Sequence, residues 1–192
     1  MAEVHILSEG YARDEGDASR VGSTVSLVRD GAALIVVDPG LVPSRSAILD
    51  PLAPLGVRPD EVTDVVFSHH HPDHTVNAAL FPNARIHDHW AVYEGDLWTS
   101  RPAEGFALSP DVTLWETPGH TPQDVTTVVR TPEGLVAFTH LWWTAEGPAE
   151  DPYAPDPALV HEHRARVLAA PGLALIVPGH GPGFAPGPDT PR

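Results

Sequence analysis

Cysteine and lysine are both absent from the 192 residues of this chain. Without cysteine there can be no disulfide, thiolate zinc site, iron–sulfur cluster or cysteine nucleophile. All 11 basic residues are arginine, which excludes a Schiff base and a lysine general base. No apolar run approaches the roughly 18 residues that a membrane-spanning helix needs, and the first residues lack a signal-peptide pattern. We therefore expect a cytoplasmic protein without a membrane partner.

Positive charge is also scarce, since 26 acidic residues against 11 arginines give a formal net charge of −15. Nucleic-acid binding relies on a basic surface, so this balance disfavours DNA or RNA and leaves a small molecule as the expected substrate. Hydrophobic residues make up 42% and charged residues 19%, which is typical of a globular protein. The length fits a single domain over residues 1–192, with a tail after about residue 183 that we expect to fray.

Short apolar runs separated by turn residues predict strands alternating with helices. Strands are predicted over residues 4–7, 24–29, 33–37, 62–67, 84–87, 112–116, 125–130, 135–139 and 173–177. Helices are predicted over residues 44–55, 75–81 and 157–169. The segment 142–157 is acidic, aromatic and rich in proline, which predicts a loop. This alternation is typical of an α/β fold.

Histidine is frequent, and its positions follow the predicted strands. Four of the 12 histidines fall within residues 68–74, directly after the strand at 62–67. His69 and His71 are two residues apart and can face one metal ion, while Asp73 and His74 can face a second. Two further histidines stand in Gly-His turns after later strands and would complete the sites: His120 and His180. Strand ends hold side chains rigidly at the rim of a sheet, so the pattern predicts a preorganised metal centre.

These motifs resemble the metallo-β-lactamase superfamily. The resemblance spans about residues 21–183 and rests on three motifs: His69-x-His71-x-Asp73-His74, Pro118-Gly119-His120 and Pro178-Gly179-His180-Gly181. Asp38 resembles the aspartate that follows an early strand in the superfamily, and Gln123-Asp124 resembles the metallo-β-lactamase domain-containing proteins and their bacterial relatives. The implied fold is an α/β four-layer αββα sandwich with metals at one edge, between the two sheets.

The resemblance also implies a binuclear metal centre and a hydrolase. The implied ligands of the first metal are His69, His71 and His120. Those of the second are Asp73, His74 and His180, and Asp73 is the expected catalytic residue. Two divalent ions, zinc first and manganese or iron as alternatives, would bind the hydroxide that attacks a small ester, thioester, lactone or phosphodiester. Asp38 would orient a ligand imidazole or an adjacent turn.

One position departs from the superfamily pattern. An aspartate that bridges both metals usually follows the strand matching residues 135–139, and here His140 stands in its place. An imidazole nitrogen normally binds one metal and brings no negative charge. His140 can be a terminal ligand of the second metal, which we favour, a ligand of the first, or no ligand. Asp151 or Glu146 could replace the missing carboxylate if the following loop folds back.

Two other functions remain open on the sequence. A mononuclear non-heme iron dioxygenase of the persulfide type would use His69, His120 and His140, an all-imidazole set unlike the triad of two histidines and one carboxylate. A non-catalytic metal-binding protein is the second alternative. A dimer is compatible with the sequence.

Side chains for the substrate are less sharply defined. Aromatic residues in two segments are candidates for a pocket wall, with packing in the core as the competing explanation: Trp142, Trp143, Tyr153 and residues 89–98. Arg101 and Arg164 are candidates for binding an anionic group, although an exposed arginine most often has no such role. Tyr11 and Tyr93 are candidates for proton donors.

Overall fold

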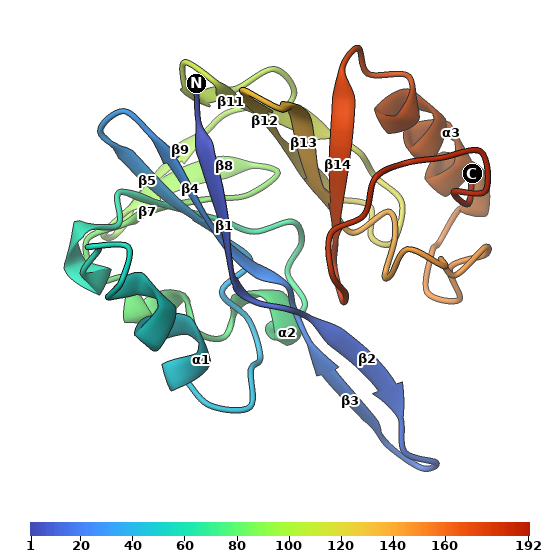
Figure 1. The fold of residues 1–192 in the computed structure, drawn as a ribbon, viewed down its shortest axis with the longest axis horizontal. Helices are drawn as coiled ribbons and strands as arrows, with labels where there is room; N and C mark the ends of the chain where they lie inside the picture. The colour runs from blue at the N-terminus through green and yellow to red at the C-terminus, as the bar shows by residue number, and fades with distance from the viewer.

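Two β-sheets lie face to face in the computed structural model, which describes residues 1–192 (Figure 1). The first has seven strands, in the spatial order β1 (Glu3–Ser8), β4 (Val25–Asp30), β5 (Ala33–Val37), β6 (Asp64–Val66), β7 (Arg85–His87), β8 (Ala91–Glu94) and β9 (Leu97–Ser100). The second has five, in the order β10 (Ala107–Ser109), β11 (Val112–Glu116), β12 (Val125–Thr131), β13 (Gly134–Thr139) and β14 (Leu173–Pro178). Two more strands pair with each other and form an arm that projects from the sheets: β2 (Tyr11–Asp14) and β3 (Ser19–Gly22).

Helices cover the two outer faces. α1 (Ser46–Leu49) lies outside the first sheet and α3 (Pro157–Leu168) lies outside the second (Figure 1). The remaining helical segments are short: α2 (Pro72–Thr75) and the 3-10 turns η1 (Asp50–Leu52), η2 (Pro59–Glu61) and η3 (Ala78–Leu80). None of these segments has the length and apolar character that crossing a membrane requires. The layers follow the order helix, sheet, sheet, helix, which confirms the predicted αββα sandwich.

The apolar runs of the sequence fill three buried clusters that separate the layers. β5 shows how one strand serves two of them. Ile35 and Val37 point between the sheets, whereas Val36 points under α1, and all three are almost fully buried. Successive side chains of a strand face opposite sides, so a strand covered on both faces is an uninterrupted apolar run. Burial on both faces holds the end of β5 firmly in place.

Two predicted helices differ from the observed ones. The segment 44–55 forms α1 and η1 in place of one long helix, because Pro51 and Pro54 lack the backbone N–H that a continuous helix uses. No continuous helix covers residues 75–81, where one was expected. The α-helical turn α2 begins earlier, at Pro72, since proline is favoured at the first helical position, and it ends at Thr75, while residues 78–80 form the separate 3-10 turn η3. Asp73 and His74 therefore lie inside α2, on a rigid turn.

Two hairpins were not predicted, namely the arm and the β8–β9 pair, and neither was β10, the short antiparallel partner of β11. Every residue of β9 is exposed, and β2 is exposed except at Tyr11. A strand that contributes no apolar face to a core shows no alternation of apolar and polar residues, so the sequence carries no signal for it.

The segment after residue 183, where the sequence predicts fraying, makes contacts with the second sheet and the loop beside it. The backbone groups of Phe184 and Ile176 exchange two hydrogen bonds, each of 2.9 Å. The carbonyl oxygen of Pro191 accepts a 2.8 Å hydrogen bond from the indole nitrogen of Trp142. Trp142 thereby gains a partner for its polar atom while its rings remain buried.

Gly40 provides the close contact between the end of β5 and α2. A Cβ atom at this position would lie 1.6 Å from the backbone oxygen of Asp73, so α2 has to move if any side chain is added. We expect Gly40→Ala to lower the free energy of unfolding by about 3 kcal/mol, at the upper end of overpacking effects. Gly187→Ala is the matched control, because nothing lies within 4 Å of its Cβ position. Urea denaturation measures both, and equal stabilities would contradict the predicted close contact.

Candidate metal centre

Six histidines and one aspartate converge where β6, β11, β13 and β14 end. Sequence reasoning named all seven: His69, His71, Asp73, His74, His120, His140 and His180. Their ligand atoms form overlapping groups within which every atom lies within 4.8 Å of the others. Two of these groups match the ligand sets that the sequence implies. We call His69, His71 and His120 the first cluster, and Asp73, His74 and His180 the second cluster.

In the first cluster, the ring nitrogens point at one another. His120 Nε2 lies 3.2 Å from His71 Nδ1. His69 Nε2 is buried and has no hydrogen-bond partner. Burial, reinforced by the neighbouring histidines, lowers the pKa of His69 well below its ordinary value. This favours the neutral imidazole, which is the form that coordinates a metal ion.

The second cluster is built around the Asp73 carboxylate. Its Oδ2 lies 3.6 Å from His74 Nε2 and 3.6 Å from His180 Nε2. The opposite nitrogen of each ring is held by the protein: His180 Nδ1 donates to the carbonyl oxygen of Gly22 at 3.0 Å, and His74 Nδ1 lies 2.9 Å from Asp38 Oδ2. These outer contacts fix both Nε2 atoms toward the carboxylate.

Asp38 has the orienting position that the resemblance implies. Its Oδ2 binds the His74 ring and its Oδ1 accepts a 2.6 Å hydrogen bond from the backbone N–H of Ser68. Burial alone would lower the pKa of His74, but the Asp38 carboxylate raises it above its ordinary value. Asp38 has a φ of +51°, a left-handed conformation that is uncommon outside glycine and occurs at functional sites.

His140 lies between the two clusters. Its ring centre is 4.2 Å from that of His120 and 4.9 Å from that of His180. Its Nε2 is 3.0 Å from His180 Nε2, and its ligand atoms also group with those of His69 and His74 and with those of His120 and Asp151. Gly179 makes room for the ring, because a Cβ there would lie 2.3 Å from His140 Cδ2.

Three buried histidine nitrogens in this region have no hydrogen-bond partner: His69 Nε2, His74 Nε2 and His140 Nδ1. A buried polar atom without a partner costs about 1–3 kcal/mol, so three of them in one place call for a ligand. Imidazole nitrogens with one carboxylate are the donor set that suits zinc and related ions. The residues present therefore fit a metal centre.

The loop between β13 and α3 folds back over the clusters, as the sequence alternative required. Asp151 does not take the bridging position, however. Its Oδ2 lies 2.8 Å from Nδ1 of His120, the ring nitrogen that points away from the first cluster. Glu146 is exposed at the mouth of the pocket. Sequence reasoning did not connect Asp151 with His120, and no local motif signals that pairing.

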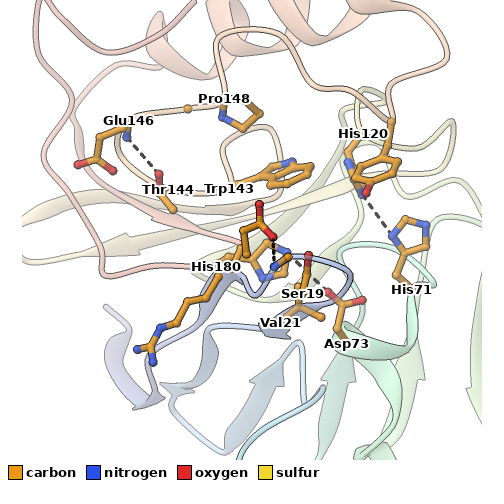
Figure 2. A pocket seen from close by; sticks show the side chains of 16 residues that line it. Ser19, Val21, His71, Asp73, His120, Trp143, Thr144, Glu146, Pro148 and His180 are labelled. Atoms are coloured by element: carbon orange, nitrogen blue, oxygen red, sulfur yellow. Dashed lines mark hydrogen bonds and ion pairs between the residues drawn. The ribbon is translucent and has the colours of Figure 1, made fainter.

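A cavity of about 900 Å³ opens above the clusters (Figure 2). His71, Asp73, His120 and His180 contribute to its lining at the metal-facing end. The arm lies on one side of the cavity. The other side is formed by the β13–α3 loop, where the rings of Trp143 and Tyr153 stack with centres 5.7 Å apart and planes at 11°.

Of the other side chains considered for the substrate, most have structural roles. Trp142 is buried among residues packed under α3, and Trp90 and Trp98 are exposed outside the cavity. The Arg164 guanidinium binds three backbone carbonyl oxygens, and that of Arg101 binds the Asp88 carbonyl. The cation that does line the cavity is Arg13 of the arm, which the sequence analysis missed.

His70 points away from the clusters and toward Asp88, whose Oδ2 lies 3.0 Å from His70 Nε2. Burial alone would raise the pKa of Asp88, but hydrogen bonds from His70, Tyr93 and two backbone N–H groups lower it to about 2. The Tyr93 hydroxyl donates to Asp88 at 2.6 Å and does not face the cavity. This tyrosine is therefore not placed to donate a proton there.

The hydrogen bonds to the Asp88 carboxylate predict that acid lowers the stability of the fold. A carboxyl whose pKa is lower in the folded state stabilises the fold above its unfolded pKa, and that contribution disappears as the pH falls through the folded pKa. The stability difference between the wild type and Asp88→Asn should therefore shrink by about 2 kcal/mol between about pH 5 and pH 2. Urea denaturation across this range measures the difference, with Asp96→Asn, an exposed turn variant, as control. A difference independent of pH would contradict the role of Asp88.

Comparison with known proteins places this geometry in a family. The model of the metallo-β-lactamase superfamily matches residues 18–187. The human metallo-β-lactamase domain-containing protein 1 is 36% identical over 94% of this chain and 81% of its own length, and the Xenopus laevis protein of that name is 32% identical over 94% and 80%.

Solved structures show the same fold. A candidate metallo-β-lactamase from Thermotoga maritima has a TM-score of 0.73 at 22% identity, covering 96% of this chain and 99% of its own. A quorum-quenching N-acyl homoserine lactone lactonase has a TM-score of 0.66 at 21% identity, covering 93% and 91%. The match to the family model and the identity to these relatives agree with the motifs and the converging clusters. The chain belongs to the metallo-β-lactamase superfamily.

Proposed function

We propose that this protein is a metal-dependent hydrolase of a small ester, thioester, lactone or phosphodiester. The observation that carries the proposal is the pair of clusters at one end of the cavity, where three buried nitrogens lack partners. Two divalent ions, zinc first and manganese or iron as alternatives, would supply an activated water and a Lewis acid when bound. The metal-binding roles of the seven converging residues and the catalytic role of Asp73 are part of the proposal.

The chain's own residues contribute three functions to such a reaction. Asp38 and Asp151 fix the orientation of His74 and His120 from behind. Asp73 offers the one carboxylate oxygen that faces the imidazole nitrogens of its cluster. The stacked rings of Trp143 and Tyr153 offer the substrate an apolar surface at the wall of the cavity. A small neutral or weakly charged molecule fits this cavity better than nucleic acid, since the chain carries a net charge of −15.

Metal content is the first test, measured by mass spectrometry on untagged protein purified without added metal. About two zinc or manganese ions per chain, followed by turnover of a member of an ester, thioester, lactone and phosphodiester panel, supports the hydrolase. One iron per chain with oxygen uptake on persulfides would replace it with the dioxygenase. Bound metal without any turnover on either panel would favour the non-catalytic alternative, and absence of metal binding would overturn the metal centre.

A further inference from the structure

Asp151 is a buried residue that contacts both His120, a candidate metal ligand, and Trp143, which lines the cavity. Its Oδ2 lies 2.8 Å from His120 Nδ1 and accepts a 2.9 Å hydrogen bond from the indole N–H of Trp143. Its Oδ1 accepts a 2.9 Å hydrogen bond from the backbone N–H of Tyr153. Both carboxylate oxygens are therefore engaged, and the side chain is only 1% exposed. Such a carboxylate determines which nitrogen of His120 carries the proton.

Arg164 holds the loop that carries Asp151. This arginine of α3 is fully buried, and its guanidinium donates to the carbonyl oxygens of Leu141, Pro148 and Ala149 at 2.7–2.9 Å. The three bonds tie both ends of the 141–149 segment to α3. Asp151 lies two residues after this segment, so the bonds of Arg164 restrict where the Asp151 side chain can lie. A fixed carboxylate is suited to orienting a ligand.

Charge gives Asp151 a second role. The superfamily usually places a bridging aspartate where this chain has His140, so Asp73 is the one carboxylate among the seven residues of the metal centre. The carboxylate of Asp151 comes next, within 4.8 Å of ligand atoms of His120 and His140. Two buried carboxylates contact the imidazoles of the clusters, each at the ring nitrogen that faces away from its cluster. Asp38 backs His74 of the second cluster, and Asp151 backs His120 of the first. A carboxylate bonded to a ligand imidazole makes that imidazole a stronger donor to a cation.

We propose that Asp151 is a positioning residue that supplies the first cluster with negative charge through His120 and couples that cluster to Trp143 of the pocket wall. The inference rests on the proposed function only in requiring that the first cluster binds a metal ion. Because Trp143 and His120 share one oxygen, a shift of the indole changes the hydrogen bonding of the carboxylate that holds His120. Contact of a substrate with Trp143 is thereby transmitted to the first cluster.

The test is a Co²⁺ titration of Asp151→Asn, followed by visible absorption and by competition with a chromophoric chelator. Asparagine keeps the shape but removes the charge, and if its carbonyl faces His120 its amide group meets the N–H of Tyr153. We expect one of two Co²⁺ ions to bind about 10–100-fold more weakly and its absorption bands to shift, as for other residues that support metal ligands. Glu150→Gln is the matched control, because Glu150 is the exposed neighbouring carboxylate. It should bind both ions like the wild type.

Trp143→Phe tests the coupling separately and does not depend on the folding of the Asp151 variant. It keeps an aromatic ring against Tyr153 but removes the indole donor, so Co²⁺ binding at one site should weaken about two- to tenfold. In the double variant with Asp151→Asn the two losses should not add, since both act on one contact. Trp142→Phe is the control, because it also removes an indole N–H. The indole nitrogen of Trp142 donates to the Pro191 carbonyl oxygen and not to Asp151, so this variant should bind Co²⁺ like the wild type.

The outcomes separate this inference from the proposed function. A wild-type protein that binds no Co²⁺ would overturn both. A wild type with two ions, together with a folded Asp151→Asn variant of unchanged affinity and absorption, would overturn the role of Asp151 and leave the metal centre intact. Additive losses in the double variant would overturn the coupling to Trp143. Should Asp151→Asn not fold, as circular dichroism would reveal, unchanged binding in Trp143→Phe decides against the coupling.

Discussion

Asp73→Asn is expected to abolish hydrolysis while the protein still folds. The Asp73 oxygen lies at equal distance, 3.6 Å, from His74 Nε2 and His180 Nε2, and it provides the second cluster with its one negative charge. An amide has the same shape but neither the charge nor the affinity for a divalent ion. Losing about 4 kcal/mol of transition-state stabilisation corresponds to a roughly thousandfold lower kcat/KM.

Folding should be little affected, because no hydrogen bond of the fold depends on the Asp73 side chain, which is in part exposed at the cavity. Steady-state kinetics on the best substrate of the panel, with thermal unfolding of the metal-free protein, separates the two effects. Asp96→Asn removes an equal charge from an exposed turn and should keep full activity. Retained turnover in Asp73→Asn would exclude Asp73 from the reaction.

His140→Ala is expected to lower the metal content from about two ions per chain toward one. The His140 Nε2 atom lies 3.0 Å from His180 Nε2, so its loss removes a donor from the second cluster. The first cluster keeps all three of its own members and should retain its ion. Mass spectrometry after dialysis against metal-free buffer measures the change. Unchanged stoichiometry would exclude His140 as a ligand of the second metal.

His140→Asp is the companion variant, because it introduces the carboxylate that the superfamily usually has at this position. If the missing charge limits binding at the second cluster, this variant should hold two ions more tightly than the wild type. Chelator competition is the measurement. Weaker binding than in the wild type would mean that the space beside Gly179 is shaped for an imidazole ring and does not admit a shorter side chain in a binding orientation.

The convergence of the seven residues could be predicted from the sequence because each of them follows shortly after a predicted strand. β5 and β6 are apolar runs, and the motif after β6 places His69, His71, Asp73 and His74 within six residues. The carboxyl ends of parallel strands meet at one edge of a sheet, which brings distant motifs of the chain together. The alternation of apolar runs and turns predicts an α/β fold, and the four αββα layers were implied by the resemblance to the superfamily.

The surroundings of the clusters could not be predicted, since they depend on contacts between segments far apart in the sequence. The path of the β13–α3 loop is determined by the Arg164 guanidinium, whose three carbonyl partners have no sequence signal. The pairing of Asp151 with His120 follows from that path. The arm has no apolar face, so neither its strands nor the position of Arg13 beside the cavity could be inferred from periodicity.

The arm lines the cavity but belongs to a different part of the chain from the residues of the candidate metal centre. Its residues from 12 to 20 are exposed and contribute nothing to the three buried clusters, whereas its base is joined to His180 through the Gly22 carbonyl. Substitutions along the arm can therefore alter one wall of the cavity at little cost to folding. If the protein is the hydrolase proposed above, selection for a new substrate could act on this hairpin while the metal-facing residues stay unchanged, so related proteins can diverge in specificity before they diverge in mechanism.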